Sequence, residues 1–172
     1  MTTRTAVELR PAQPADADRI ADLFLAARAA TMSYLPRLHS DAETRAWVIH
    51  VMLPSHRVWV ATRPDTPEVL GFAALDDDLL EHLYLHPDRR RQGIGSLLLA
   101  QVQQASPDGL SLHVFRRNEN AIAFDLQHGF RLVSISDGAG NEEREPDATY
   151  RWTPPSPRKV DVRSLLSPLC RT

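Results

Sequence analysis

The sequence predicts an α/β domain with a single mixed central β-sheet. Three observations lead to this fold class. Segments with strand alternation and segments with helical spacing follow one another in the order β-α-α-β-β-β-α-β-α-β-β, about seven strands and four helices. A chain of 172 residues can bury one substantial core. Its composition, 42% hydrophobic and 24% charged, is that of an ordinary globular protein. Residues 1–152 are expected to form the domain, with a Pro-rich C-terminal tail over 153–172.

The first elements are a strand and two helices. Apolar and polar side chains alternate over residues 7–10, which predicts a short strand. Pro14 suits the first turn of a following helix, which should end near Ala29. Its core-facing residues recur at helical spacing and are Ile20, Leu23, Phe24 and Ala27. Residues 31–40 are irregular in pattern, and a second helix is predicted over about 41–52.

Three strands come next. Two apolar runs, 57–62 and 69–75, are separated by a Pro/Asp turn and predict a hairpin. After the acidic turn at 76–78, residues 79–85 read as a further strand. A basic, glycine-bearing loop over 88–95 then leads into a helix over 96–103.

The remaining elements alternate again between strand and helix. A short strand is predicted over 110–114, and a helix over 120–128 is expected to end at Gly129. The last two strands are predicted over 131–135 and 149–152, with a turn-rich segment between them.

The loop between the strand ending at Leu85 and the helix beginning at Ser96 is the most informative segment. Its two glycines, Gly93 and Gly95, let the backbone approach a ligand, and a helix N-terminus supplies unpaired N–H donors. The run from Arg89 to Arg91 adds full positive charges. These features predict a phosphate or pyrophosphate site. The alternative is a capped helix preceded by a solvated basic turn.

Two common nucleotide folds are disfavoured. A P-loop needs Gly-Lys-Ser/Thr after a longer glycine spacing, and the chain has no such motif. A dinucleotide fingerprint needs a third glycine, but Leu98 occupies that position.

The loop carries a resemblance to a known family. Arg90-Arg-Gln-Gly93-Ile-Gly95 matches the Q/R-x-x-G-x-G/A signature of the GNAT N-acetyltransferases, between a strand and a helix. A second segment about 25 residues later, Asn118-Glu-Asn-Ala121-Ile-Ala-Phe124-Asp-Leu-Gln-His-Gly129-Phe130, resembles the family's N-x-x-A-x-x-F-Y-x-x-x-G-F pattern. The resemblance spans roughly residues 7–152 and is closest to bacterial members of undefined substrate.

The resemblance implies acetyl-CoA as the acyl donor and assigns residues to it. In this family the strand before the loop splays from its parallel neighbour at a bulge, and the pantetheine arm lies in the gap. The backbones of Leu83, Tyr84 and Leu85 are then expected to pair with pantetheine amides, although the side chains of Leu83, Leu85 and Phe124 also fit plain core packing. The remaining expected cofactor contacts are the N–H groups of Arg90, Arg91, Gln92, Gly93, Ile94, Gly95 and Ser96, together with Asn118, Ala121 and Phe124.

The resemblance also suggests catalytic groups. Glu81, in the strand expected to bulge, is the candidate general base, with an ordinary surface glutamate as the alternative. Many members place a tyrosine acid where this chain has Asp125. An unperturbed aspartate is ionised at neutral pH, so Asp125 fits that role only if burial raises its pKa. Otherwise Tyr84 or Tyr150 serves, or the thiolate leaves unaided.

The acceptor side is expected where two loops meet. Tyr34 and His39 lie in the irregular segment after the first helix, and Asn141 and Glu142 lie in an acidic segment before the last strand. Carboxylates there suit a cationic amine, while internal salt bridges with Arg144 are the common alternative.

We therefore expect acetyl transfer to a primary amine, either of a small molecule or of a peptide N-terminus. Transfer of a longer acyl group and acyl-CoA sensing without catalysis are the alternatives.

A net charge of −2 gives no footprint for nucleic acid, and the histidines form no ligand-spaced metal motif. No apolar signal core or membrane-length segment occurs, and the single Cys170 excludes an internal disulfide, so a cytoplasmic location is expected. Homodimers are frequent in the family, so a second copy is one expected partner.

Overall fold

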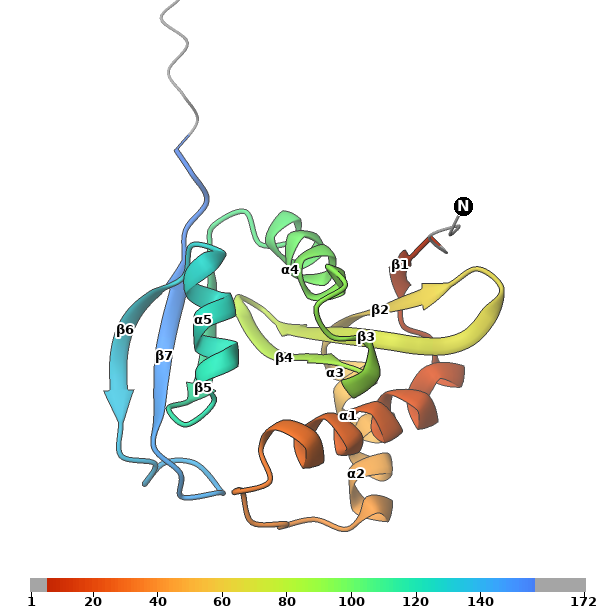
Figure 1. The fold of residues 1–172 in the computed structure, drawn as a ribbon, viewed down its shortest axis with the longest axis horizontal. Coiled ribbons are helices and arrows are strands. Elements are labelled where there is room, and N and C mark those ends of the chain that lie inside the picture. The colour runs from red at the N-terminus through yellow and green to blue at the C-terminus, as the bar shows by residue number, and fades with distance from the viewer. Residues whose placement is uncertain (1–5, 157–172) are drawn as a thin grey trace, which may run out of the picture.

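The computed structural model describes residues 6–156. Residues 1–5 and 157–172, which hold Cys170 and most of the predicted tail, lie outside the described residues. Within the described part, seven strands form one mixed sheet in the order β1-β2-β3-β4-β5-β7-β6 (Figure 1). Neighbouring strands pair antiparallel except β4 and β5, which are parallel. The predicted fold class is confirmed.

The elements follow the predicted order. They are β1 (Glu8–Pro11), η1 (Pro14–Asp16), α1 (Ala17–Thr31), α2 (Asp41–Trp47), η2 (Val48–Met52), α3 (Leu53–Ser55), β2 (Arg57–Arg63), β3 (Thr66–Asp76), β4 (Leu79–Leu85), η3 (Pro87–Arg89), α4 (Ile94–Gln104), β5 (Leu110–Phe115), α5 (Glu119–Gln127), β6 (Arg131–Ser136) and β7 (Asp147–Trp152).

Two boundaries differ from the sequence-based expectation by three residues. β3 begins at Thr66 because Arg63 already pairs with Thr66, which leaves a turn of only two residues. Its first residues are polar or exposed and therefore lack an apolar strand signal. The second helix continues to Ser55 through the π-helical turn η2, and the extended backbone of His56 ends it.

The sheet is covered on both faces. α1 and η2 pack on one face through side chains such as Ile20, Leu23 and Met52. α4 packs on the other face through Ile94, Leu98 and Val102, and α5 borders the same cluster with Phe124. Burying these apolar side chains is the main favourable term in folding. The two layers hold β4 rigidly between them, with one of its faces toward each layer.

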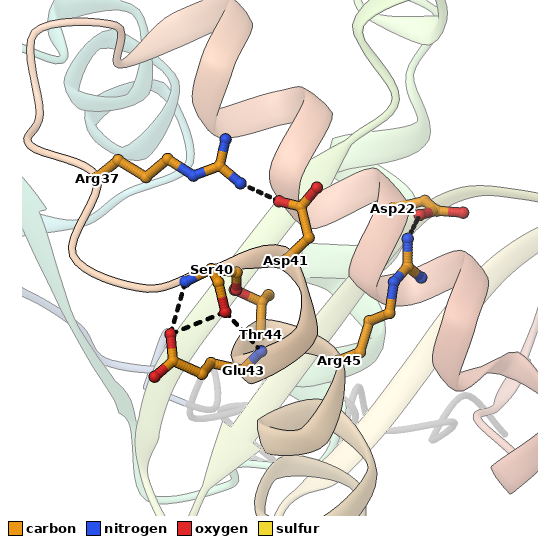
Figure 2. A network of polar contacts seen from close by, with 7 residues as sticks. All are labelled: Asp22, Arg37, Ser40, Asp41, Glu43, Thr44 and Arg45. Atoms are coloured by element: carbon orange, nitrogen blue, oxygen red, sulfur yellow. Dashed lines mark hydrogen bonds and ion pairs between the residues drawn. The ribbon is translucent and has the colours of Figure 1, made fainter.

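The start of α2 is fixed by polar contacts (Figure 2). Ser40 and Glu43 form a capping box, in which the Ser40 backbone N–H donates to Glu43 over 2.7 Å and the Glu43 N–H donates to Ser40 Oγ over 3.2 Å. Arg45 pairs with Asp22 of α1, and Arg37 pairs with Asp41. These contacts fix the end of the segment that contains His39 and join α2 to α1.

Candidate functional site

β4 and β5 begin as neighbours and then separate. They pair only at Leu79↔Ser111 and Leu80↔Leu112, although β4 continues to Leu85. A cavity of about 1120 Å³ opens beyond the second pair, lined by β4, β5, the loop before α4, and α5. In Figure 1 β4 runs in a different direction from β7, the strand that pairs with β5 on its other side. The expected splayed strand pair is therefore present, and the β4 backbone beyond Leu80 has no β5 partner.

A β-bulge in β4 aims Glu81 into this region. β3 pairs Ala74 with His82 and Leu75 with Leu80, so Glu81 is the extra residue. The bulge changes the alternation of the strand: Leu80 and Leu83 both pack toward α4, while His82 contacts Phe24 of α1 at a ring distance of 5.7 Å. Glu81 lines the cavity and keeps 38% of its side chain exposed.

The loop before α4 has the backbone shape of an anion-binding turn. Arg91 and Gly93 both adopt positive φ, at 61° and 81°, and Gly93 is the N-cap of α4. A non-glycine residue in this conformation is strained, and such strain concentrates at functional sites. Arg90 and Arg91 are exposed and line the cavity, as do Gly93, Gly95 and Ser96. The N–H groups of a helix N-terminus together with two cations suit a phosphate group.

The side chains of three loop residues are not placed to contact a cofactor in the cavity. Arg89 pairs with Glu68 of β3 at 3.1 Å. The Ile94 side chain is buried in the core beneath α4, so only its backbone is available to a ligand. Gln92 is exposed and does not line the cavity.

Gly95 of α4 faces Phe124 of α5 across the cavity wall. A Cβ built there meets the Phe124 ring at 3.4 Å and Leu85 at 3.5 Å. Phe124, Ala121 and Asn118 all line the cavity from α5. Asn118 also caps α5, because its Oδ1 accepts from the Ala121 N–H over 3.4 Å.

A histidine connects the two helices that flank the cavity. His128 Nδ1 lies 2.7 Å from the Phe124 carbonyl oxygen and therefore donates to it. In the neutral ring Nε2 is then an acceptor, and it lies 2.9 Å from Ser96 Oγ at the start of α4. His128 thus links α5 to the start of α4, although the family pattern of the second motif does not specify a residue at its position.

Asp125 is buried on α5 and lines the cavity. The residue is only 6% exposed, and this burial raises the pKa of its carboxyl group to about 7. A carboxyl group with this pKa is about half protonated at neutral pH and mostly protonated below it, whereas an ordinary aspartate is almost fully ionised there. The role of proton donor requires that burial raise the pKa of Asp125, and this requirement is met.

Tyr84 also lines the cavity and lies within an aromatic group on the α1 face. Its ring is 5.2 Å from Phe24 and 5.9 Å from His82. Burial raises the pKa of Tyr84, and the Arg28 guanidinium opposes that effect. The phenol is a neutral donor at physiological pH. Tyr150 is buried in the core of the sheet.

The two predicted acceptor segments do meet. Glu143 pairs with Arg28 of α1 at 2.8 Å, and Glu142 lies 3.1 Å from His39 at an exposed contact. Asn141 lines the cavity, but its side-chain amide braces its own loop by bonding to Glu145 and Asp147. Tyr34, His39 and Glu142 do not line the cavity and lie beside it.

Sequence reasoning missed several residues of the site. Arg28, His82 and His128 line the cavity, and His56 contacts Glu81. Arg28 and His56 come from elements distant in the sequence, and no local motif marks them. His82 follows Glu81 in β4 and His128 lies within the second motif, at positions that the family pattern does not specify. The apolar spacing of α1 accounts for its core face only and gives no signal for Arg28.

Two further searches of the described residues found nothing. In residues 6–156 no group of three histidine, cysteine, aspartate or glutamate side chains is arranged to hold a metal ion. None of the helices that the structure describes combines the length and apolarity required to cross a bilayer.

Part of the chain is similar to a known family of domains. Residues 54–132 match the family model described as the acetyltransferase (GNAT) domain. A segment of 85 residues is 34% identical to the peptidyl-lysine N-acetyltransferase YjaB of Salmonella typhimurium, covering 49% of this chain and 57% of that protein. The chain spans only about half the length of the curated relatives it matches.

Solved structures extend the likeness of fold beyond the matched segment. Apo YjaB from Escherichia coli superposes with a TM-score of 0.71 at 22% identity, over 86% of this chain and 97% of that one. The structure of yncA from Salmonella typhimurium with its cofactor acetyl-CoA gives 0.67 at 18% identity, over 91% and 98%. The glycine loop and the whole of the second motif fall inside the matched residues, and the shared fold surrounds them. Residues 54–132 are thus similar to the GNAT acetyltransferase domain, and the described residues share the fold of these solved structures.

Proposed function

We propose that the protein transfers an acetyl group from acetyl-CoA to a primary amine. The observation that carries this proposal is the splayed β4/β5 pair, whose cavity runs from Glu81 to the strained loop at the start of α4. An elongated donor with a polar arm and a diphosphate matches a cavity with a free strand edge at one end and a cationic loop at the other. The GNAT family match supports the same donor.

The residues present fit this donor. The backbones of Leu83, Tyr84 and Leu85 offer unpaired edge groups to the amides of the pantetheine arm. The N–H groups from Arg90 to Ser96 and the guanidinium groups of Arg90 and Arg91 would hold the diphosphate. Asn118, Ala121 and Phe124 form the α5 wall. Bound there, acetyl-CoA supplies an activated thioester carbonyl.

Two carboxyl groups suit the two proton transfers that the reaction needs. We propose Glu81 as the base that takes a proton from the attacking amine, directly or through water. Asp125, with a pKa of about 7, is the proposed proton donor to the departing thiolate. Tyr84 is the alternative donor, since it lines the same cavity and its pKa is raised.

A lysine side chain is the acceptor class we propose to test first. Glu81, Glu143 and Asp147 line the cavity and give it carboxylates that attract an ammonium group. The similar proteins from Salmonella typhimurium and Escherichia coli are named peptidyl-lysine N-acetyltransferases, which supports the same class. Small amines and peptide N-termini are the alternatives.

A homodimer remains a proposal, for which the free edge strand β6, with Leu132, Val133 and Ile135 exposed, is the surface we favour.

The test combines donor binding with turnover. Acetyl-CoA binding is measured by calorimetry, and thiol release is followed with lysine peptides, N-terminal peptides and small amines. The Gly93→Asp variant places a carboxylate in the phosphate loop, where space is open but φ is positive. Gly93→Asn is the matched control, because asparagine tolerates this φ and adds no charge.

Each outcome separates the hypotheses. Tight binding that Gly93→Asp abolishes and Gly93→Asn retains supports the donor site, and thiol release with an amine supports the enzyme. Binding without thiol release on every amine class favours the acyl-CoA sensor. Turnover only with longer acyl-CoA esters identifies a different acyl group. No binding by the native protein refutes the proposal.

A further inference from the structure

His56 lies against Glu81 from outside the main cavity. It begins the extended backbone after α3, and its side chain is only 8% exposed. Its Nε2 lies 2.5 Å from Glu81 Oε2. His56 lines a separate cavity of about 520 Å³, on the side of β1, η2 and β2, whereas Glu81 lines the main one. The pair therefore spans the wall between the two cavities.

The orientation of the His56 ring is fixed by its other nitrogen. Nδ1 lies 2.8 Å from Ser55 Oγ, which in turn lies 2.5 Å from the Val51 carbonyl oxygen. A carbonyl only accepts, so the single Ser55 hydroxyl proton belongs to Val51. Ser55 Oγ must then accept a hydrogen bond from the His56 Nδ1–H. This chain of contacts turns Nε2 toward Glu81.

A proton must also lie between His56 and Glu81. With Nδ1 protonated, the neutral ring would present a bare Nε2 to a bare carboxylate, and the two would repel each other. The contact is stable only when the ring carries a second proton at Nε2 or the carboxyl group carries one at Oε2. Only the first arrangement, an imidazolium that donates from Nε2 to a carboxylate, leaves Glu81 able to act as a base, and in it a charge-assisted hydrogen bond holds Oε2.

The neighbouring His82 does not supply this hold. Its Nε2 is 3.7 Å from Glu81 Oε2, beyond hydrogen-bond distance. Burial lowers the pKa of His82 to about 3, with the charges of His56 and Arg28 adding to the effect, so its ring is neutral. Among the described residues, Glu81 Oε1 makes no hydrogen bond and is left for an incoming group.

We propose that His56 is a positioning residue for Glu81. Its ring ties Oε2 to the end of α3 and so fixes the carboxyl group at the bulge, with Oε1 available to an amine or a bridging water. The role rests on the proposed acetyl transfer, in which Glu81 is the base. A carboxylate held in one orientation loses less rotational freedom at the transition state.

Kinetics of three variants test this role. His56→Ala removes the hold, His56→Gln keeps an N–H donor at similar reach, and His50→Ala alters an exposed histidine of η2 that lines neither cavity. With acetyl-CoA and a lysine peptide, we expect His56→Ala to lower kcat by about tenfold or more. KM for the peptide and acetyl-CoA affinity should change little, while the melting temperature should fall because a buried side chain and its two hydrogen bonds are lost. His56→Gln should recover most of the loss, and His50→Ala should match the native protein. A kcat for His56→Ala within about twofold of native, or a His56→Gln variant as slow as His56→Ala, overturns the role.

A spectroscopic measurement keeps the pair separate from the proposed activity. Proton NMR of the native protein should show a downfield His56 N–H resonance protected from exchange, and Glu81→Gln should shift it strongly. Absence of this resonance refutes the hydrogen bond and the positioning role. If the resonance is present but no amine is acetylated, the proposed function fails and the catalytic role fails with it, while the hydrogen bond itself stands.

Discussion

At the residue scale, Asp125 shows how a position that departs from a family pattern can keep its chemistry. An aspartate in water is acidic and would repel a departing thiolate. Here burial raises its pKa to about 7 from an ordinary value of 3.8, so the group stays protonated where an exposed aspartate would not. Burial, rather than residue type, decides whether this position can donate a proton.

The same shift predicts how stability varies with pH. The folded state binds the Asp125 proton more tightly than the unfolded state does. Below about pH 4 the carboxyl group is protonated in both states, so its full contribution to the free energy of unfolding is present there. Stability should fall as pH rises from there to about 7, because the unfolded chain ionises first, and should then level off. The full loss is on the order of 4 kcal/mol.

The Asp125→Asn variant should remove this dependence. We expect it to match the native protein in denaturant melts near pH 4 and to be more stable near pH 8, by up to the loss just given. If the difference between the two proteins is the same at both pH values, Asp125 ionises normally in the folded state. Asp125→Asn should also slow thiol release if the carboxyl group is the proton donor.

Individual residues show where sequence-based prediction ends. Glu81, Asp125 and the loop glycines were found because they lie in or beside local motifs. A bulge in the strand that holds Glu81 was expected, but the structure shows that Glu81 is its extra residue. The contact of Glu81 with His56 depends on how α3 meets β2, 25 positions earlier in the chain. Arg28 and His128 were likewise brought to the site by packing between elements.

At the element scale, the segment from η3 to α4 separates two kinds of arginine. Arg89 is paired with Glu68 on β3, which ties the loop to the sheet. Arg90 and Arg91 face solvent at the mouth of the cavity, and the positive φ of Arg91 directs the backbone there. Three consecutive arginines of one sequence run therefore have different roles.

This division predicts different effects of two substitutions. Arg91→Ala should weaken acetyl-CoA binding about tenfold at low salt, since it removes a charge-assisted contact, and the loss should shrink as salt is raised. Arg89→Ala should leave the affinity nearly unchanged and slightly lower the melting temperature. Calorimetry at two salt concentrations and thermal melts distinguish them. Equal losses of affinity in both variants would contradict the assignment.

Element boundaries were predicted to within about three residues because their signals are local. Apolar spacing marked α1 and α4, and Gly129 marked the end of α5 with its positive φ of 88°. The early start of β3 was missed because Thr66–Glu68 are largely exposed and carry no apolar pattern. The predicted second helix included η2 but missed its last turn, α3, because Pro54 is a residue that commonly ends a helix.

At the scale of the whole molecule, the sheet is weakest where the cavity opens. β1 to β4 and β5 to β7 are each joined by continuous antiparallel ladders, but β4 and β5 share only two paired positions. The family's order of strands predicts this gap. Which side chains line it from α1, α5 and the loop before β7 depends on tertiary packing, and only the structure shows them together.

A ligand that fills this gap should stabilise the fold as one unit, because it contacts both halves of the sheet. At a concentration of 100 times its Kd, a ligand that binds only the folded state adds about 2.7 kcal/mol of stability. For a domain of this size that corresponds to a melting temperature higher by about 5–10 °C. Thermal melts with acetyl-CoA should show this rise in the native protein, a much smaller one with acetyl-pantetheine, which lacks the diphosphate, and none in Gly93→Asp. A full rise with acetyl-pantetheine would place most of the binding energy in the β4/β5 gap and would contradict the role assigned to the glycine loop.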